Sequence, residues 1–155
     1  MPIEDAKKLN QWIKGGKNFL VYLGSPGSGK TYMCAALIKY CWPKFESCRY
    51  WNEKKLMERL HVSMQEKHDY IKTIEYLCDD ELVVLDDLGS LGLNDWRREV
   101  IFEFLDKRYC SEKPTIITSN FSREEIKNQF HPRVASRLFC KENTIIESWG
   151  VDKRE

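Results

Sequence analysis

Residues Gly24 to Thr31, with the sequence GSPGSGKT, have the types and spacing needed to hold a chain of phosphates. They fit the pattern GxxxxGK[ST] in full. Its glycines permit backbone angles that a Cβ would block, so the N–H groups of the loop can turn inward around an anion. Lys30 can place its charge on the β- and γ-phosphates, and the Thr31 hydroxyl can ligate Mg²⁺. We therefore predict an ATP site that consists of Gly24, Ser25, Pro26, Gly27, Ser28, Gly29, Lys30 and Thr31.

Two adjacent carboxylates, Asp86 and Asp87, follow the apolar run LVVL at residues 82–85. Ligands of open α/β sheets bind at the carboxyl ends of the strands, so both carboxylates should face the crevice of the phosphate loop. Asp86 is the candidate to hold Mg²⁺ through water, together with Thr31, and Asp87 is placed to activate an attacking water. Alternatively, Asp87 only caps the turn at Gly89. The second carboxylate favours hydrolysis, because water is then the acceptor.

Further polar residues lie beyond a third apolar run, TIIT at residues 115–118. Asn120 could hydrogen-bond the γ-phosphate or the attacking water, although Ser-Asn is also common in turns. Arg133 and Arg137 are four residues apart and hence share one face of a short helix. Such a pair can simply be solvated. It can also serve an ATP bound by a neighbouring subunit, where an arginine finger contributes roughly 10³–10⁵ in rate.

Strands and helices must alternate along the chain to position these residues. Apolar runs without alternation predict strands buried on both faces at 19–23, 82–87 and 115–120, with further strands at 48–51 and 144–149. Helices are predicted at 3–13 (apolar at Ile3, Ala6, Leu9 and Ile13), 31–40, 54–60 and 70–77, then after Asn94, after a capping box at Ser122 and from Pro132. This alternation predicts an α/β fold, a three-layer P-loop NTPase core with a parallel sheet.

The composition narrows the class of protein. The 155 residues suit one core, and we expect a single domain over residues 1–155. The net charge is +1, so any nucleic-acid surface must be a local patch. No apolar run approaches the roughly 20 residues that cross a bilayer, and no secretory signal opens the sequence, which predicts a cytoplasmic protein without membrane contact. The six cysteines include no CxxC pair, so we expect free thiols rather than a zinc site.

The segments GSPGSGKT, VVLDDLG, PTIITSN and RVASRL together resemble the AAA+ ATPase domain of the DnaC/DnaI helicase loaders and of their relative IstB, the transposition ATPase. The resemblance extends from the first helix to the final GVDKR. It implies an AAA+ core with no separate lid domain and with an extra helical element within residues 53–77. It also implies that Asn120 is the sensor 1 residue, Arg137 the arginine finger and Arg154 the sensor 2 arginine.

The resemblance implies partners as well: single-stranded DNA, a replicative helicase or other partner ATPase, and other copies of the chain, which self-associate through Arg137. Basic and aromatic side chains at residues 54–72 could contact DNA, although acidic residues are interleaved as on any solvated helix. These side chains are Lys54, Lys55, Arg59, His61, Lys67, His68, Tyr70 and Lys72. The loaders grip the helicase with an N-terminal domain, and this sequence begins at the ATPase domain. We therefore expect targeting by another protein or by a surface of this domain, or else a different partner.

Three other functions stay open. They are an IstB-like transposition ATPase, a small P-loop nucleotide or nucleoside kinase, and a module that binds ATP without hydrolysing it. A kinase would need a lid with arginines over the phosphates, and the sequence between the third and fourth core strands contains none. Intact Lys30, Asp87 and Arg137 argue against a module that does not hydrolyse ATP. We predict an ATP-dependent helicase loader or remodeller of DNA replication that uses ATP and Mg²⁺.

Overall fold

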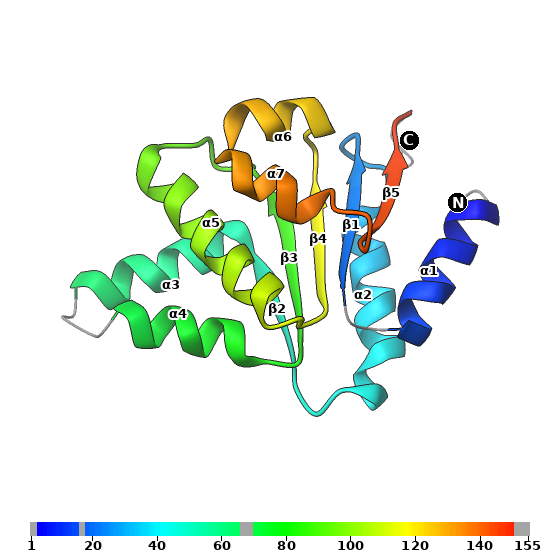
Figure 1. Ribbon diagram of the computed structural model, residues 1–155, viewed down its shortest axis with the longest axis horizontal. Coiled ribbons are helices and arrows are strands. Elements are labelled where there is room, and N and C mark those ends of the chain that lie inside the picture. Colours follow the sequence, from blue (N-terminus) through cyan, green and yellow to red (C-terminus); the bar gives the residue numbers. More distant parts are fainter. Residues whose placement is uncertain (1–2, 16–17, 66–69, 151–155) are drawn as a thin grey trace.

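The computed structural model describes residues 3–15, 18–65 and 70–150 and contains a single five-stranded sheet among them (Figure 1). The strands are β1 Phe19–Gly24, β2 Cys48–Asn52, β3 Leu82–Leu88, β4 Thr115–Ser119 and β5 Thr144–Ser148. Their order across the sheet is β2-β3-β4-β1-β5, and all neighbouring strands are parallel. The predicted parallel α/β architecture is therefore confirmed, and β1, β3 and β4 lie at its centre.

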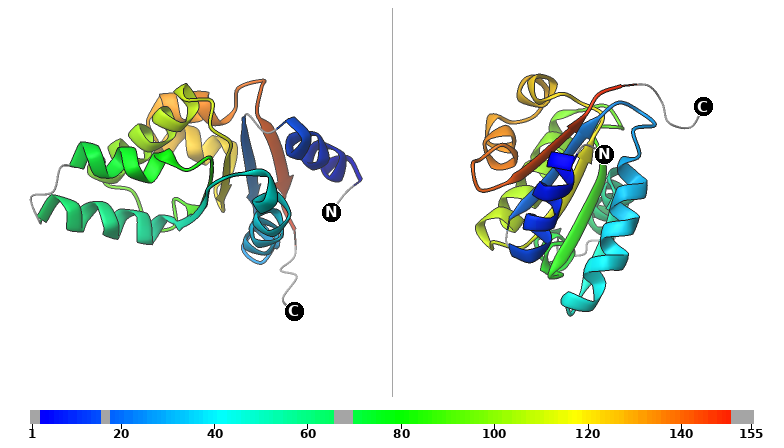
Figure 2. Two further views of the ribbon diagram at one scale, coloured as in Figure 1. Left: turned by 90° about the horizontal axis from the view of Figure 1, so that it is seen from below. Right: turned by 90° about the vertical axis from the view of Figure 1, so that its right-hand side faces the viewer.

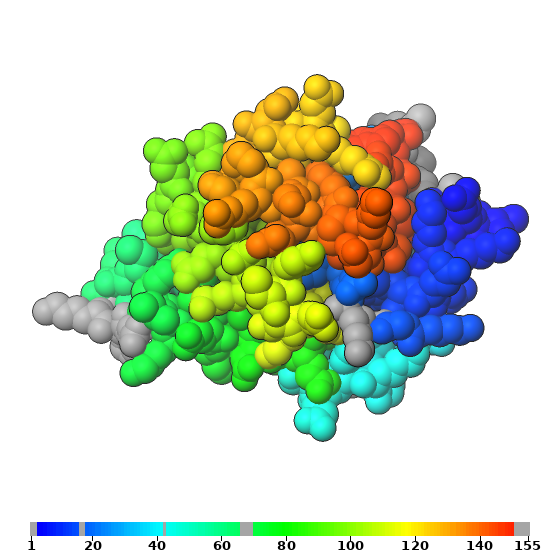
Figure 3. All heavy atoms as spheres, viewed as in Figure 1, coloured from blue at the N-terminus to red at the C-terminus, as the bar shows by residue number. Residues whose placement is uncertain are grey.

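Helices cover both faces of the sheet (Figure 2). Their bounds are α1 Ile3–Gly15, α2 Lys30–Cys41, a 3₁₀ turn at Trp42–Lys44, α3 Glu53–Gln65, α4 Tyr70–Asp79, α5 Asp95–Cys110, α6 Arg123–Gln129 and α7 Pro132–Leu138. Helices α1 and α2 pack on one face, and α3 to α7 contribute to the core on the other. The space-filling view shows α5, α6 and α7 on the outside of that second face (Figure 3). Sheet and helices thus form three layers.

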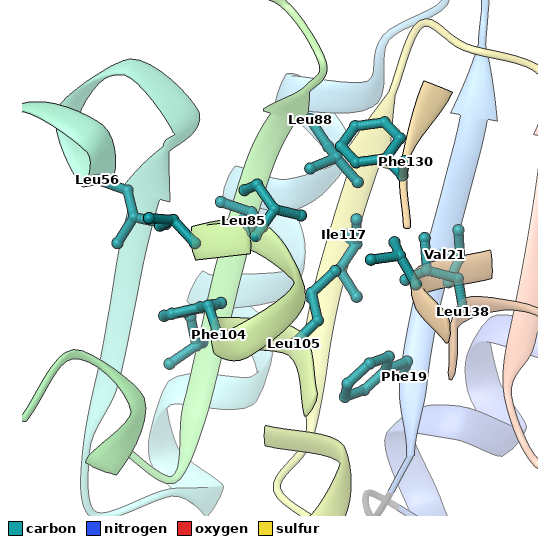
Figure 4. Packing of buried hydrophobic residues seen from close by; sticks show 14 of the residues in the cluster. Phe19, Val21, Leu56, Leu85, Leu88, Phe104, Leu105, Ile117, Phe130 and Leu138 are labelled. Carbon is teal, nitrogen blue, oxygen red and sulfur yellow. The ribbon is translucent and has the colours of Figure 1, made fainter. Parts of the chain in front are cut away.

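The central strands are apolar throughout because both of their faces are buried. Successive side chains of a strand point to opposite faces. In β1, Phe19, Val21 and Leu23 therefore join the core under α3 to α7, while Leu20 and Tyr22 join the core under α1 and α2. Figure 4 shows the larger of these cores, with side chains of β1, β3 and β4 packed against the helices. The runs predicted as fully buried strands are confirmed.

Local signals placed the helix starts correctly. Asn94 caps α5 by accepting a hydrogen bond from the N–H of Arg97. Ser122 and Glu125 form the predicted reciprocal capping box at the start of α6. The two helices predicted after β2 are longer than expected, and α3 and α4 occupy the range in which the resemblance implied an extra helical element.

The predicted first helix is confirmed as α1, although not all of the apolar residues that predicted it are buried. Ile3 is 79% exposed, whereas Trp12, which the stripe did not include, is buried and donates a hydrogen bond of 2.7 Å to the carbonyl of Asn18. Only Leu9 and Ile13 of the predicted stripe pack against the core. Helix α1 contacts β5, and within its first turn Asp5 is buried whereas Ile3 faces away from the core.

Among the described residues, no separate helical lid accompanies the α/β unit. No helix in that part of the chain combines the length and the apolar character that crossing a membrane requires. All six cysteines are free, as expected from their spacing.

Candidate functional site

The loop between β1 and α2 contains the predicted phosphate-binding residues. A Cβ added at Gly24 would lie 2.4 Å from the carbonyl oxygen of Ser148 in β5, so only glycine fits where the two strands meet. Gly27 and Gly29 have φ angles of 75° and 93°, which side chains disfavour. The first N–H groups of α2 have no acceptor within the helix, and with the helix dipole they favour an anion at this end.

Lys30 folds back over the loop that precedes it. Its Nζ donates hydrogen bonds of 2.8 Å to the carbonyls of Gly24 and of Ser25, and it lies 3.5 Å from Oγ of Ser28. The side chain is buried although it carries a charge. A buried ammonium is tolerated because these oxygens replace water around it.

Asp86, near the carboxyl end of β3, is buried, and its carboxylate accepts hydrogen bonds from hydroxyl groups of three different elements. Thr31 of α2 and Tyr50 of β2 donate to its Oδ2, over 3.0 Å and 2.5 Å, and Thr118 of β4 donates to its Oδ1. Sequence reasoning missed Tyr50 and Thr118. Thr118 lies near the carboxyl end of β4, which is a signal that could have found it, whereas Tyr50 lies in the middle of β2. Burial, reinforced by Asp86, raises the pKa of Tyr50, so its hydroxyl stays protonated and keeps donating.

Asp87 adopts the left-handed conformation, with φ of 60°. Its backbone N–H donates to Oγ1 of Thr118 over 3.0 Å. Its carbonyl accepts from the N–H of Ser90, so the backbone rather than the side chain closes the turn. Burial, and next the neighbouring Asp86, raise the pKa of Asp87, while Lys30 acts in the opposite direction.

A pocket of about 400 Å³ brings several of the predicted residues together, although Asp86 is not part of its lining. Its lining consists of Pro26, Gly27, Gly29, Lys30, Thr31, Tyr32, Asp87 and Asn120. Asn120 is exposed and directly follows β4. The carboxyl ends of β1, β3 and β4 therefore meet at one pocket, which the order of strands in the sheet makes possible.

Comparison with known proteins decides the family. The family model described as IstB-like ATP binding protein matches residues 3–138. The chain belongs to the IstB-like ATP-binding family. The fold and the resemblance that its motifs indicated are thereby confirmed.

Proteins similar to this chain include helicase loaders. The replicative helicase loader DnaI of Bacillus subtilis is 34% identical over 129 residues, 79% of this chain and 40% of DnaI. The putative ATP-binding protein of insertion sequence IS1162 of Pseudomonas fluorescens is 29% identical over 108 residues, 70% of this chain and 46% of that protein. The crystal structure of the DnaC helicase loader has a TM-score of 0.81 at 28% identity, covering 93% of this chain and 88% of that one. The chain spans about half the length of the curated relatives it matches.

Arg137 of this IstB-like chain does not line the pocket beside Lys30 in its own chain. Its Nε donates a 2.9 Å hydrogen bond to Oδ1 of Asp106 in α5, and its guanidinium lies 4.7 Å from the centre of the Tyr109 ring. Arg133 is exposed and reaches the ring of Phe102, also in α5. Both arginines thus lie on the α5 side of α7. Arg154 falls outside the described residues.

A second hollow of about 300 Å³, here called the α3 groove, lies beside α3. Its lining consists of Lys54, Met57, Glu58, His61, Leu91, Trp96 and Arg97. The rings of His61 and Trp96 meet edge to face, with centroids 6.0 Å apart. Lys54 and His61 belong to the basic stretch predicted from the sequence, whereas Trp96 and Arg97 come from the first turn of α5 and were not predicted to share a surface with it. Lys67 and His68 lie outside the described residues.

Proposed function

We propose that this IstB-like chain is an ATPase module that binds ATP with Mg²⁺ and hydrolyses it. The observation that carries the proposal is the pocket shared by Lys30, Thr31, Asp87 and Asn120, together with the hydrogen bond from Thr31 to Asp86. A phosphate-binding loop alone would suit any P-loop protein. The adjoining carboxylate of Asp87 and the amide of Asn120 add groups suited to directing a water.

The oxygen donors of the pocket fit magnesium bound with phosphates. Mg²⁺ prefers oxygen ligands and keeps several of its waters. Thr31 and Asp86 offer a hydroxyl and a carboxylate 3.0 Å apart. No group of three or more His, Cys, Asp or Glu that could hold a metal occurs among the described residues. The protein would therefore supply few ligands itself, and Mg²⁺ would neutralise charge that develops on the phosphates.

Each side chain then has a role that its position supports. Lys30 can exchange its contacts with the Gly24 and Ser25 carbonyls for phosphate oxygens. Asp87 would take the proton of the attacking water, and burial that raises its pKa makes it a stronger base. Asn120 would hold that water or the γ-phosphate.

Asp87→Asn tests this proposal. General bases contribute roughly 10²–10⁴ in rate, so phosphate release should fall by about a hundredfold or more. Nucleotide affinity should stay within about twofold, because the amide keeps the shape of the side chain and the phosphate loop is intact. The matched control is Asp95→Asn, an exposed carboxylate at the start of α5. Full turnover in Asp87→Asn would rule out Asp87 as the base.

Arg137 would complete the ATP site of a neighbouring copy. In this chain it is held by Asp106, on a helix that is separate from the pocket. Self-association would therefore be needed to bring it to a nucleotide. Arg154 is proposed as a sensor 2 residue on the resemblance of GVDKR alone.

We further propose that the module serves as a helicase loader or remodeller on single-stranded DNA. Two relatives support this proposal by name, DnaI and DnaC. The α3 groove supports it by chemistry, because Lys54 and Arg97 can contact phosphates and the rings of His61 and Trp96 offer faces for bases. The IS1162 relative and the family name favour a transposition ATPase as the second candidate.

Gel filtration with purified partners separates the two candidates. A loader should form an ATP-dependent complex with the replicative helicase of its own organism. A transposition ATPase should ignore the helicase and join a transposase instead. ATP-independent elution as a monomer with either partner would contradict both.

A further inference from the structure

Glu53, the first residue of α3, is a carboxylate with no exposed surface. Its Oε2 accepts hydrogen bonds from the backbone N–H groups of Gly89, over 2.6 Å, and of Ser90, over 3.0 Å. Its Oε1 is also buried and finds no hydrogen-bond partner within the described part of the chain. Burial raises the pKa of this carboxyl, the two N–H donors only partly offsetting it. An apolar side chain at this position would avoid the free-energy cost of burying a carboxylate. The two hydrogen bonds that Glu53 accepts from the turn therefore indicate a role for this carboxylate.

The turn that Glu53 holds is the one that contains Asp87. The N–H of Ser90 also bonds the carbonyl of Asp87, and Asp87 has a φ of 60°. The pairing of β3 with β4 shifts register between Leu85 and Leu88, where the chain enters the turn. A left-handed conformation is strained for a residue with a side chain and persists only where surrounding contacts hold it.

Contacts from two sides fix this turn. From β4, Thr118 accepts the N–H of Asp87, and Ser119 donates to the carbonyl of Leu88 over 2.7 Å. From the other side comes Glu53, which takes the next two N–H groups. Helix α3 then continues along the α3 groove, where Leu91, the residue after Ser90, is also part of the lining.

We propose that Glu53 is a positioning residue for Asp87. It holds Gly89 and Ser90 so that the turn keeps Asp87 left-handed and its carboxylate at the phosphate pocket. The same contact ties the start of α3, and with it the α3 groove, to that pocket. This role rests on the proposed hydrolysis of ATP, in which Asp87 is the base.

Two substitutions test this role, one that removes the hydrogen-bond acceptor of Glu53 and one that preserves it. Glu53→Ala deletes it, whereas Glu53→Gln keeps a carbonyl oxygen of the same reach. In Glu53→Ala, kcat should fall about tenfold or more, a part of the roughly 10²–10⁴ that a general base contributes, while KM and nucleotide affinity stay within about twofold. Glu53→Gln should stay within about threefold of the wild type. Glu4→Ala, which removes an exposed carboxylate from the first turn of α1, is the matched control and should leave both parameters unchanged.

Hydrogen exchange at the Gly89 and Ser90 amides provides a readout that needs no activity. Both amides should lose protection in Glu53→Ala and keep it in Glu53→Gln, with the core strands unaffected. If Glu53→Ala does not fold, Glu53→Asp, whose carboxylate is withdrawn by one methylene, replaces it with the same expectations.

The outcomes separate this inference from the proposed function. A wild-type protein that never hydrolyses ATP would refute the proposed function, and the exchange measurement would still decide whether Glu53 holds the turn. Wild-type kcat, or unchanged exchange at both amides, in a folded Glu53→Ala would overturn the inference and leave the ATPase intact. Equal losses in Glu53→Ala and Glu53→Gln would overturn it as well, because the acceptor would then not be what matters.

Discussion

The hydroxyl of Thr31 donates a hydrogen bond of 3.0 Å to Oδ2 of Asp86 and thereby joins the first turn of α2 to the end of β3. The hydroxyl of Tyr50 donates to the same oxygen. A buried carboxylate held by hydroxyl groups is oriented before any ion arrives, which spares the cost of ordering it during binding.

Thr31→Val should raise the Mg²⁺ concentration that ATP hydrolysis requires, because valine has the shape of threonine but lacks the oxygen that would bind the ion. Loss of an outer partner of a metal typically costs roughly 10–100-fold in affinity, and a direct ligand should cost at least as much. The measurement is the Mg²⁺ concentration at half-maximal phosphate release. Thr31→Ser, which keeps the hydroxyl, should resemble the wild type. An unchanged Mg²⁺ requirement in Thr31→Val would show that Thr31 is not a ligand.

Arg137→Ala should bind ATP normally and fail to hydrolyse it, with a loss of roughly 10³-fold or more, as expected for an arginine finger. Mixing it with Lys30→Ala should restore some activity. Lys30→Ala lacks the charge that binds the phosphates but can lend its Arg137 to a neighbour. Phosphate release is measured across mixing ratios, with Arg133→Ala as the control from the same helix. Intact assembly without rescue at any ratio would mean that Arg137 does not act across subunits.

Single-stranded DNA should bind in an ATP-dependent and salt-dependent manner. Each neutralised phosphate contributes roughly −0.7 to the slope of log affinity against log salt concentration on single strands. Reversing the charge of Lys54 and Lys55 should make that slope less steep by the contribution of about one to two phosphate contacts. ATP binding should stay unchanged. Fluorescence anisotropy of a labelled oligonucleotide provides the measurement, and Lys127→Glu on α6 is the control. Binding that is indifferent to salt and ATP would contradict the DNA proposal.

The stability of the wild type relative to Glu53→Gln should fall as the pH rises. Burial raises the pKa of Glu53 in the folded protein above its usual 4.5, so the folded state holds the proton more tightly than the unfolded state. The resulting stability is complete below the usual value and is lost as the pH rises through the folded pKa, by about 1.4 kcal/mol for each unit of the shift. Glutamine does not titrate. The measurement is the free energy of unfolding of both proteins in urea at pH 4 and at pH 7. A difference between wild type and Glu53→Gln that is the same at both pH values would contradict the prediction.

Local sequence patterns predicted the elements and the phosphate loop for a physical reason. Glycine angles, helix caps and apolar periodicity depend on residues a few positions apart. The loop Gly24 to Thr31 and the capping box at Ser122 can therefore be predicted from the sequence without knowledge of the fold. The apolar spacing that begins at Ile3 predicted α1 correctly but not the exposure of Ile3, because periodicity shows which residues share a face and not whether a surface covers all of them.

Contacts between residues that are far apart in the sequence could not be predicted from such local patterns. Tyr50 and Asp86 lie 36 residues apart, and they meet only because β2 and β3 are neighbours in the sheet. Glu53 looked like one of many acidic residues on a solvated helix. It is instead buried against Gly89, 36 residues later.

The sequence by itself determined that this chain has a P-loop, two carboxylates at the end of a buried strand and a parallel α/β core, because those features are set by neighbours along the chain. Only the tertiary structure decided what surrounds them. The strand order β2-β3-β4-β1-β5 brings Thr31, Tyr50 and Thr118 to Asp86, and it leaves Arg137 paired with Asp106 away from its own pocket. No spacing in one sequence encodes such meetings, since they depend on which strands pair and on which helix packs beside them.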